Sequence, residues 1–136
     1  MPVDDDVLRS RISEVRLAMD ELQRLTSKPF AELNVDERYS MRYNIVVMVE
    51  SLASLCVHLA TEAYAQRPMS YREAVRAVVE KMDLRGVEDL ESLVGLRNLL
   101  IHRYWIVEDE RVYQGVKTNF KCVEKFLSRV EEAFLS

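Results

Sequence analysis

Residues with chemically useful side chains gather in one stretch, from position 97 to position 105. In nine residues the chain places Arg97, Asn98, His102, Tyr104 and its only tryptophan, and His102 is one of just two histidines. An imidazole can accept or donate a proton near neutral pH, and a guanidinium can hold a phosphate through paired hydrogen bonds. Cleavage of RNA by its own 2′-hydroxyl needs these two functions and no metal ion. Arg97 is therefore the candidate for charge stabilisation, and His102 for proton transfer.

The same residues have an ordinary structural interpretation. A histidine beside an arginine and a tyrosine on a helix is more often a partly buried polar residue than a catalyst. Trp105 is expected to lie in the core, since large aromatic side chains usually do. Residue chemistry by itself leaves both interpretations open.

Helical spacing separates the two catalytic candidates. If one helix runs through the segment, Asn98 and His102 share a face, and Arg97 lies almost directly below Tyr104. Arg97 and His102 then diverge by about 140°, so within one chain they meet only where the helix bends or ends. A two-fold dimer would bring two copies of the segment into one cleft. The spacing therefore predicts a composite site at a subunit interface.

The composition predicts one all-α domain covering residues 1–136. Hydrophobic residues make up 49% of the chain and charged residues 31%, and only three glycines and three prolines interrupt it. The net charge of −4 and a pI near 5.3 exclude a broad basic surface for nucleic acid, so any contact with RNA is local and no DNA binding is expected.

Other functional classes receive little support. Cys56 and Cys122 belong to no paired spacing, so both are interpreted as small buried residues, with no disulfide, metal or cofactor expected. The start of the chain lacks the pattern of a signal peptide, and no run approaches the eighteen or more consecutive apolar residues of a membrane span. A cytoplasmic protein is expected.

Capping signals and apolar periodicity predict an up-and-down bundle of about five helices. The first begins at the acidic run 4–6 and ends near residue 26, and the second runs from a capping box at Asn34 and Glu37 to about Tyr64. The third opens at a box formed by Ser70 and Glu73, and Gly86 is expected to end it as a left-handed cap. The fourth runs from about residue 88 into the motif. The last is expected to be a single helix from an N-cap at residue 109 to residue 134.

The second helix carries apolar residues on two faces, which makes it either the centre of the bundle or half core and half subunit interface. One face holds Met41, Ile45, Met48, Leu52, Leu55 and Leu59, and the other holds Val46, Val49, Ala53, Cys56, Ala60 and Ala63.

The motif resembles that of a known group of helical ribonucleases. Arg97 to Tyr104 fits the Arg-x4-His-x-Tyr signature of the HEPN superfamily, and the longer string from Gly95 to Trp105, followed by residues 109–113, is similar to the HepT-like branch. The resemblance covers roughly residues 35 to 135 and is specific only from Gly95 to Tyr113. It implies a HEPN-like, homodimeric toxin that cleaves RNA.

That resemblance also implies the roles of individual residues. Arg97 and His102 would be the catalytic pair, with Asn98 supporting them. Tyr104 would be the hydroxyl that a cognate minimal nucleotidyltransferase antitoxin modifies by AMPylation, in a type VII-like toxin–antitoxin pair. The family often has an aspartate on the second helix where Ser54 stands here, and of the Asn-His pair that follows it only His58 agrees. His58 is interpreted as a core or interface residue.

A second function belongs to a different class: a non-catalytic helical module that binds a nucleotidyltransferase or a nucleotide. A separate basic stripe on the last helix could guide RNA or meet an acidic partner, although a solvated face is the more ordinary interpretation. The stripe consists of Lys117, Lys121, Lys125 and Arg129.

Overall fold

The computed structural model describes residues 3–135 and places six α-helices and two short 3-10 helices along the chain. In order these are α1 (Asp5–Leu25), η1 (Phe30–Glu32), α2 (Val35–Glu62), α3 (Tyr71–Lys81), α4 (Val87–His102), η2 (Tyr104–Ile106), α5 (Asp109–Asn119) and α6 (Lys121–Phe134). The fold is all-α, as the composition predicts.

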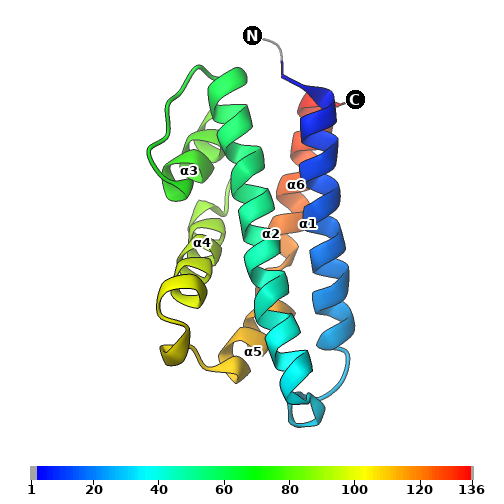
Figure 1. Ribbon diagram of the computed structural model, residues 1–136. Helices are drawn as coiled ribbons and strands as arrows, with labels where there is room; N and C mark the ends of the chain where they lie inside the picture. The colour runs from blue at the N-terminus through cyan, green and yellow to red at the C-terminus, as the bar shows by residue number, and fades with distance from the viewer. Residues whose placement is uncertain (1–2, 136) are drawn as a thin grey trace.

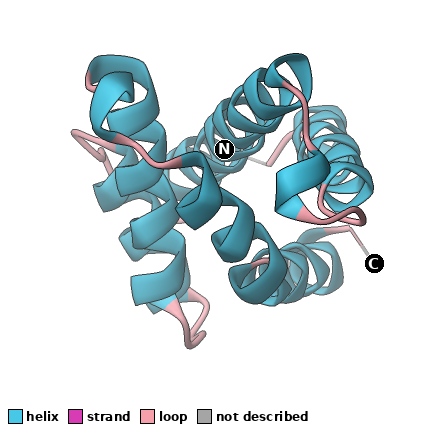
Figure 2. Cartoon of the chain, turned by 90° about the horizontal axis from the view of Figure 1, so that it is seen from below, coloured by secondary structure: helices cyan, strands magenta, loops and turns pink. Residues whose placement is uncertain are grey.

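Four arms run up and down in the bundle (Figure 1). Helix α1 descends and α2 returns beside it, α4 descends with α3 lying at its upper end, and α5 and α6 form the last ascending arm. Seen from below, the helices surround a common core, and short loops connect them (Figure 2). Both ends of the described chain lie at the same end of the bundle.

The last arm contains two helices where the sequence predicts one. The break falls at Phe120, which keeps a helical backbone but is buried and ends α5. Polar side chains beside it bond to the local backbone: Thr118 donates to the carbonyl of Gln114, and the Cys122 thiol donates to the carbonyl of Asn119. Such local bonds compete with the helical pattern, which explains a break that apolar periodicity alone does not indicate.

Helix α2 is the centre of the bundle. All six residues of its first apolar face are at most 1% exposed, and on the second face Val49, Ala53, Cys56 and Ala60 are fully buried as well. Both apolar faces of α2 therefore pack inside one chain, so the second face is not available as a subunit interface. Helix α2 is also the one described helix long and apolar enough to cross a membrane. Its burial on two sides is the behaviour of a core helix.

Two of the predicted caps form as expected and three differ. Asp4 caps α1, and the Asn34–Glu37 capping box is complete in both directions. At α3, Ser70 accepts from the backbone of Glu73, but the Glu73 carboxylate accepts from Met69 instead of Ser70.

Gly86 was predicted to end the third helix, and this was wrong. Its predicted left-handed backbone is confirmed. Helix α3 already ends at Lys81, where Asp83 takes a positive φ of 55°, and Gly86, at φ 88°, is the residue that precedes α4. Residue 109 differs in a similar way, since Glu108 occupies the N-cap position and Asp109 is the first residue of α5.

Arg16 ties the first helix to the last and makes stability depend on pH. Its guanidinium binds Glu124 at 2.7 Å and Glu131 at 2.8 Å, and these hydrogen bonds hold the pKa of the Glu131 carboxyl below its usual range. A lowered folded-state pKa stabilises the protein above the unfolded value of about 4.3, and this contribution is lost as the pH falls through the folded-state value. More than a third of each of these three side chains is exposed, so the contribution is about 1 kcal/mol or less.

We expect Arg16→Gln to lower the thermal midpoint at pH 7 and to flatten its decline between about pH 5 and pH 3. Thermal unfolding followed by circular dichroism at each pH measures both effects. Arg67→Gln, on an exposed loop arginine, is the control and should follow the wild-type curve. Parallel curves for wild type and Arg16→Gln across this range would contradict the assignment.

Candidate active site

Helix α4 ends within the motif. His102 is its last residue, Arg103 leaves the helix with φ −141° and ψ 43°, and Tyr104 begins the short helix η2. The predicted stacking of Arg97 below Tyr104 on one continuous helix was therefore wrong. A helix end at this point frees Tyr104 from the helical register and lets the chain turn toward α5.

Arg97 is held firmly by its neighbours. Its Nη2 donates to Glu50 Oε1 of α2 at 2.8 Å, and its Nη1 donates to Asn98 Oδ1 at 3.0 Å. The guanidinium carbon lies 5.3 Å from the centre of the Tyr71 ring, within cation–π range. The side chain is only 18% exposed, and its Nε is buried without a hydrogen-bond partner in the described part of the chain. Asn98 is thus a direct hydrogen-bond partner of Arg97.

His102 has the opposite environment. It is exposed, and within residues 3–135 no hydrogen bond links its ring to Arg97 or to any other side chain. Every residue from Ile101 to Ile106 is exposed as well. The structure therefore brings Arg97 and Asn98 together and leaves His102 on the outside, pointing to no partner within its own subunit.

Trp105 lies at the surface, which overturns the expectation of a core residue. Its side chain is 66% exposed and contacts the Tyr104 ring edge-on, with the ring centres 5.3 Å apart. Tyr104 is 61% exposed as well. Because η2 turns outward where α4 stops, the aromatic residues that follow His102 cannot reach the core.

Arg42 positions the segment that carries Tyr104. From α2 it donates to the backbone carbonyls of Tyr104 at 2.9 Å and Val107 at 2.7 Å, and it forms an ion pair with Asp109 at the start of α5. One half-buried guanidinium thus fixes both ends of η2. Sequence reasoning missed Arg42, because nothing in its spacing connects it with a segment more than 60 residues away.

A second arginine lies close to Arg97. Arg72, at the start of α3, lines with Arg97 a small cavity of about 300 Å³ that also includes Tyr71 and Asn98. Arg72 passes directly over Gly95: a Cβ at that position would lie 2.5 Å from Arg72 Nη2. The glycine at the start of the motif therefore makes room for this guanidinium. Two guanidiniums on one cavity can bind a phosphate, and only Gly95 gave a sequence signal for the second one.

A family model described as Ribonuclease HepT-like matches residues 12–130, which include every residue of the motif. The chain belongs to the HepT-like family. A search of curated proteins finds no match to this sequence.

Solved structures share the HepT-like fold at low sequence identity. A crystal structure of a toxin–antitoxin with AMP-PNP superposes with a TM-score of 0.84 at 17% identity, over 94% of this chain and 99% of that one. A mutant of the toxin–antitoxin MntA-HpeT gives a TM-score of 0.82 at 17% identity, with the same coverage. YutE of Bacillus subtilis, described as a cytosolic protein of unknown function, gives 0.78 at 15% identity, over 98% of this chain and 92% of that one. At these identities the likeness shows the fold alone.

On α2 this HepT-like chain has a carboxylate one turn before the position of Ser54. That residue is Glu50, and it provides the acidic partner of Arg97. His58 lies far along the helix, near the start of the chain, where its Nε2 accepts a hydrogen bond from the backbone of Asp4 at 3.2 Å. His58 is thus half-buried and structural. Across residues 3–135, no three histidine, cysteine or acidic side chains form a group that could hold a metal ion.

Proposed function

We propose that the protein is a metal-independent endoribonuclease toxin of the HEPN/MNT type, with Arg97 and His102 as its catalytic pair. The observation that carries the proposal is the environment of Arg97, a largely buried guanidinium held beside an open cavity inside a complete family motif. A fixed cation at a concave surface is suited to a phosphodiester whose negative charge increases during the reaction.

The chemistry requires no added group. The RNA 2′-oxygen attacks the adjacent phosphorus, the bond from phosphorus to the 5′-oxygen breaks, and the products are a 2′,3′-cyclic phosphate and a 5′-hydroxyl. One proton leaves the attacking hydroxyl and another reaches the leaving oxygen, and His102 carries out one of these transfers. Arg97 stabilises the negative charge on the phosphoryl oxygens, and Asn98 and Glu50 hold its guanidinium in place.

A homodimer would complete this site. Among residues 3–135 no side chain forms a hydrogen bond with the His102 ring, and the large apolar side chains around it are exposed. Five of the eleven large hydrophobic residues exposed in the described chain lie between Leu99 and Ile106, and Tyr39 and Tyr43 are exposed one turn apart on α2. Clustered exposure of this kind is typical of an interaction surface. We propose that a second subunit covers it and brings its own motif to the cleft.

Cleavage of RNA in the presence of a chelator tests the proposed activity. We expect wild-type protein to release fragments ending in a 2′,3′-cyclic phosphate and His102→Ala to be slower by about 10²–10⁴-fold. His58→Ala is the matched control, since it removes the only other histidine, and its cleavage should stay near the wild-type rate. Equal cleavage by His102→Ala and wild type would refute the assignment of His102. No cleavage by wild type on any RNA would favour the non-catalytic module.

We further propose that a minimal nucleotidyltransferase partner silences the toxin by AMPylation of Tyr104. The phenol oxygen attacks the α-phosphorus of ATP, pyrophosphate leaves, and the phenolic proton passes to a base or to water. Support comes from the exposed hydroxyl of Tyr104, from its place two residues after His102, and from the fold shared with toxin–antitoxin structures. An attached AMP adds bulk and negative charge where RNA must approach His102.

Coexpression with a nucleotidyltransferase encoded beside this gene, followed by intact-mass measurement, tests the modification. We expect the wild type to gain one or more AMP units and Tyr104→Phe to gain none. Tyr39→Phe, on another exposed tyrosine, is the control and should be modified normally. AMP on Tyr104→Phe would identify a different acceptor.

We place the toxin and its nucleotidyltransferase partner in the cytoplasm, where RNA substrates are found.

A further inference from the structure

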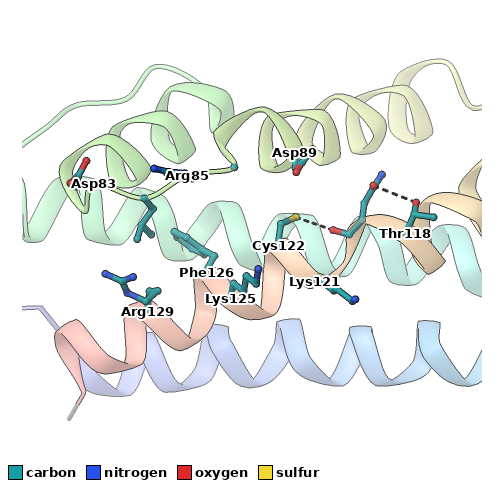
Figure 3. A pocket seen from close by; sticks show the side chains of 12 residues that line it. Asp83, Arg85, Asp89, Thr118, Lys121, Cys122, Lys125, Phe126 and Arg129 are labelled. Carbon is teal, nitrogen blue, oxygen red and sulfur yellow. Dashed lines mark hydrogen bonds between the residues drawn. The ribbon is translucent and has the colours of Figure 1, made fainter.

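A pocket of about 570 Å³ lies between the α3–α4 connection and α6, and none of residues 97–105 lines it (Figure 3). One wall is the connection from α3 to α4, with Asp83, Arg85 and Asp89, and the opposite wall is α6, with Cys122 and Phe126 among its lining residues. The volume lies within the range of pockets that bind small molecules. It is larger than the cavity of about 300 Å³ beside Arg97.

Basic side chains dominate the rim. Arg85 comes from the loop before α4, and Lys121, Lys125 and Arg129 come from successive turns of α6. Within the described chain Arg85, Lys121 and Lys125 have no ion-pair partner, and Arg129 meets Glu132 only at 3.7 Å on an exposed surface. These four cations face two carboxylates, so the pocket carries a positive charge on a protein whose net charge is −4.

The structure therefore divides the basic stripe of the last helix. Lys117, at the start of the stripe, lines a different cavity and lies over the Tyr113 ring, 5.4 Å from its centre. The remaining three cations join Arg85 around one pocket, and Lys121 borders both cavities. Arg85 comes from a loop 36 residues before Lys121 in the sequence and adds a fourth cation to this pocket.

The inner walls offer other contacts. Leu84 and Phe126 provide an apolar side, and Thr118 and Asn119 add a hydroxyl and an amide at one end. Gly86 also lines the pocket and precedes α4 without any side-chain cap, so the first amides of that helix add to the positive potential. The pocket thus combines cations, an apolar wall and neutral hydrogen-bonding groups.

We propose that this pocket binds a small organic phosphate, with its phosphate held by basic side chains of the rim and its uncharged part against Phe126. The two carboxylates, Asp83 and Asp89, favour a compact ligand carrying hydroxyl or amino donors. They disfavour an RNA strand, which would bring a phosphate to each of them in turn. The ligand class is therefore a phosphorylated molecule of about mononucleotide size.

The site is separate from the ribonuclease motif. Helix α4 begins at this pocket and ends at His102, and its 16 residues span about 24 Å at 1.5 Å per residue. Binding at one end of α4 therefore involves none of the residues proposed for catalysis. The proposal stands whether or not the protein cleaves RNA.

Calorimetric titration of the purified chain with inorganic phosphate, ribose 5-phosphate and AMP tests the pocket. We expect ribose 5-phosphate or AMP to bind more tightly than inorganic phosphate, and Lys121→Ala/Lys125→Ala to weaken that binding at least tenfold. Lys117→Ala is the matched control, since it removes a lysine of the same stripe outside the pocket, and its affinity should stay within twofold. His102→Ala should also bind normally, which separates this site from the motif.

Cys122 provides a second readout on the unaltered protein. The chain has two cysteines, and Cys56 is fully buried, so a thiol reagent reaches Cys122 alone in the folded state. Burial and the nearby Asp89 raise the pKa of the Cys122 thiol, so labelling is best followed at alkaline pH. We expect saturating ribose 5-phosphate or AMP to slow labelling at least fivefold in wild type and in Lys117→Ala.

Three results would overturn the proposal. The first is that none of the three phosphates binds and none protects Cys122. The second is equal weakening by Lys117→Ala and Lys121→Ala/Lys125→Ala, which would indicate general charge attraction. The third is tight binding of a short RNA that depends on Lys121 and Lys125 while the small phosphates do not bind, which would assign the cations to an RNA path.

Discussion

Arg97→Ala is expected to lower the rate of RNA cleavage by about 10²–10³-fold, since removal of one preorganised donor to a developing oxyanion typically has this effect. Arg97→Lys should recover little, because a lysine cannot donate to Glu50 and a phosphate in the same planar arrangement. Initial rates on one RNA substrate, with the thermal midpoint measured in parallel, separate loss of chemistry from loss of folding.

Two control variants separate a specific role of Arg97 from a general loss of charge. Arg103→Ala removes an exposed arginine of the same motif and should reduce the rate far less. Glu50→Gln keeps an oxygen that can accept from Arg97, so we expect a change of less than about tenfold. A rate for Arg97→Ala similar to that of Arg103→Ala would contradict a special role for Arg97.

Mixing two inactive variants tests whether the site is composite. In a dimer of Arg97→Ala and His102→Ala chains, one of the two Arg97–His102 pairs in the cleft joins the intact Arg97 of one subunit to the intact His102 of the other. Random exchange of subunits should then restore about a quarter of wild-type activity. A mixture that stays inactive after subunit exchange would place the whole site within one chain.

Arg42→Met is expected to have the largest effect on stability among the polar substitutions. The guanidinium donates to two backbone carbonyls and to Asp109, and hydrogen bonds to charged groups typically contribute about 1.5–3 kcal/mol each. Since methionine fills similar space but leaves these acceptors half-buried and unpaired, we expect the free energy of unfolding to fall by about 2–4 kcal/mol.

Urea denaturation measures this loss, and hydrogen exchange locates it. The amides of residues 103–109 should exchange faster in Arg42→Met while those of α1 change little. Arg24→Met, which removes an exposed ion pair with Glu21 inside α1, should leave the unfolding midpoint unchanged. Equal midpoints for Arg42→Met and Arg24→Met would show that the contacts of Arg42 contribute nothing to stability.

Local signals in the sequence predicted the helices well. Asp4 and Asn34 cap helices that begin where the sequence indicates, and the two apolar faces of α2 explain why it lies at the centre. Each of these features depends on residues a few positions apart, so periodicity and capping rules detect them. The motif residues themselves are also local, which allowed the family to be recognised.

Contacts between segments distant in the sequence explain the features of the site that local sequence patterns did not predict. Glu50, Arg42 and Arg72 all lie at or beside the motif, yet each is 23 or more residues away from its partner there. Arg42 holds the chain that follows the end of α4 at His102. No glycine or proline marks this helix end in the sequence. Trp105 is exposed for the same reason, since its position follows from the turn and not from its hydrophobicity.

Because Trp105 is exposed, its fluorescence emission can report changes at the motif. As the only indole in the chain, it is the dominant emitter on excitation at the red edge of absorption, and in the isolated subunit it is in contact with water. Unfolding should therefore shift its emission little, whereas coverage by a second subunit or an antitoxin should move the emission to shorter wavelength. A dilution series of the unlabelled protein can thus report assembly at the cleft directly.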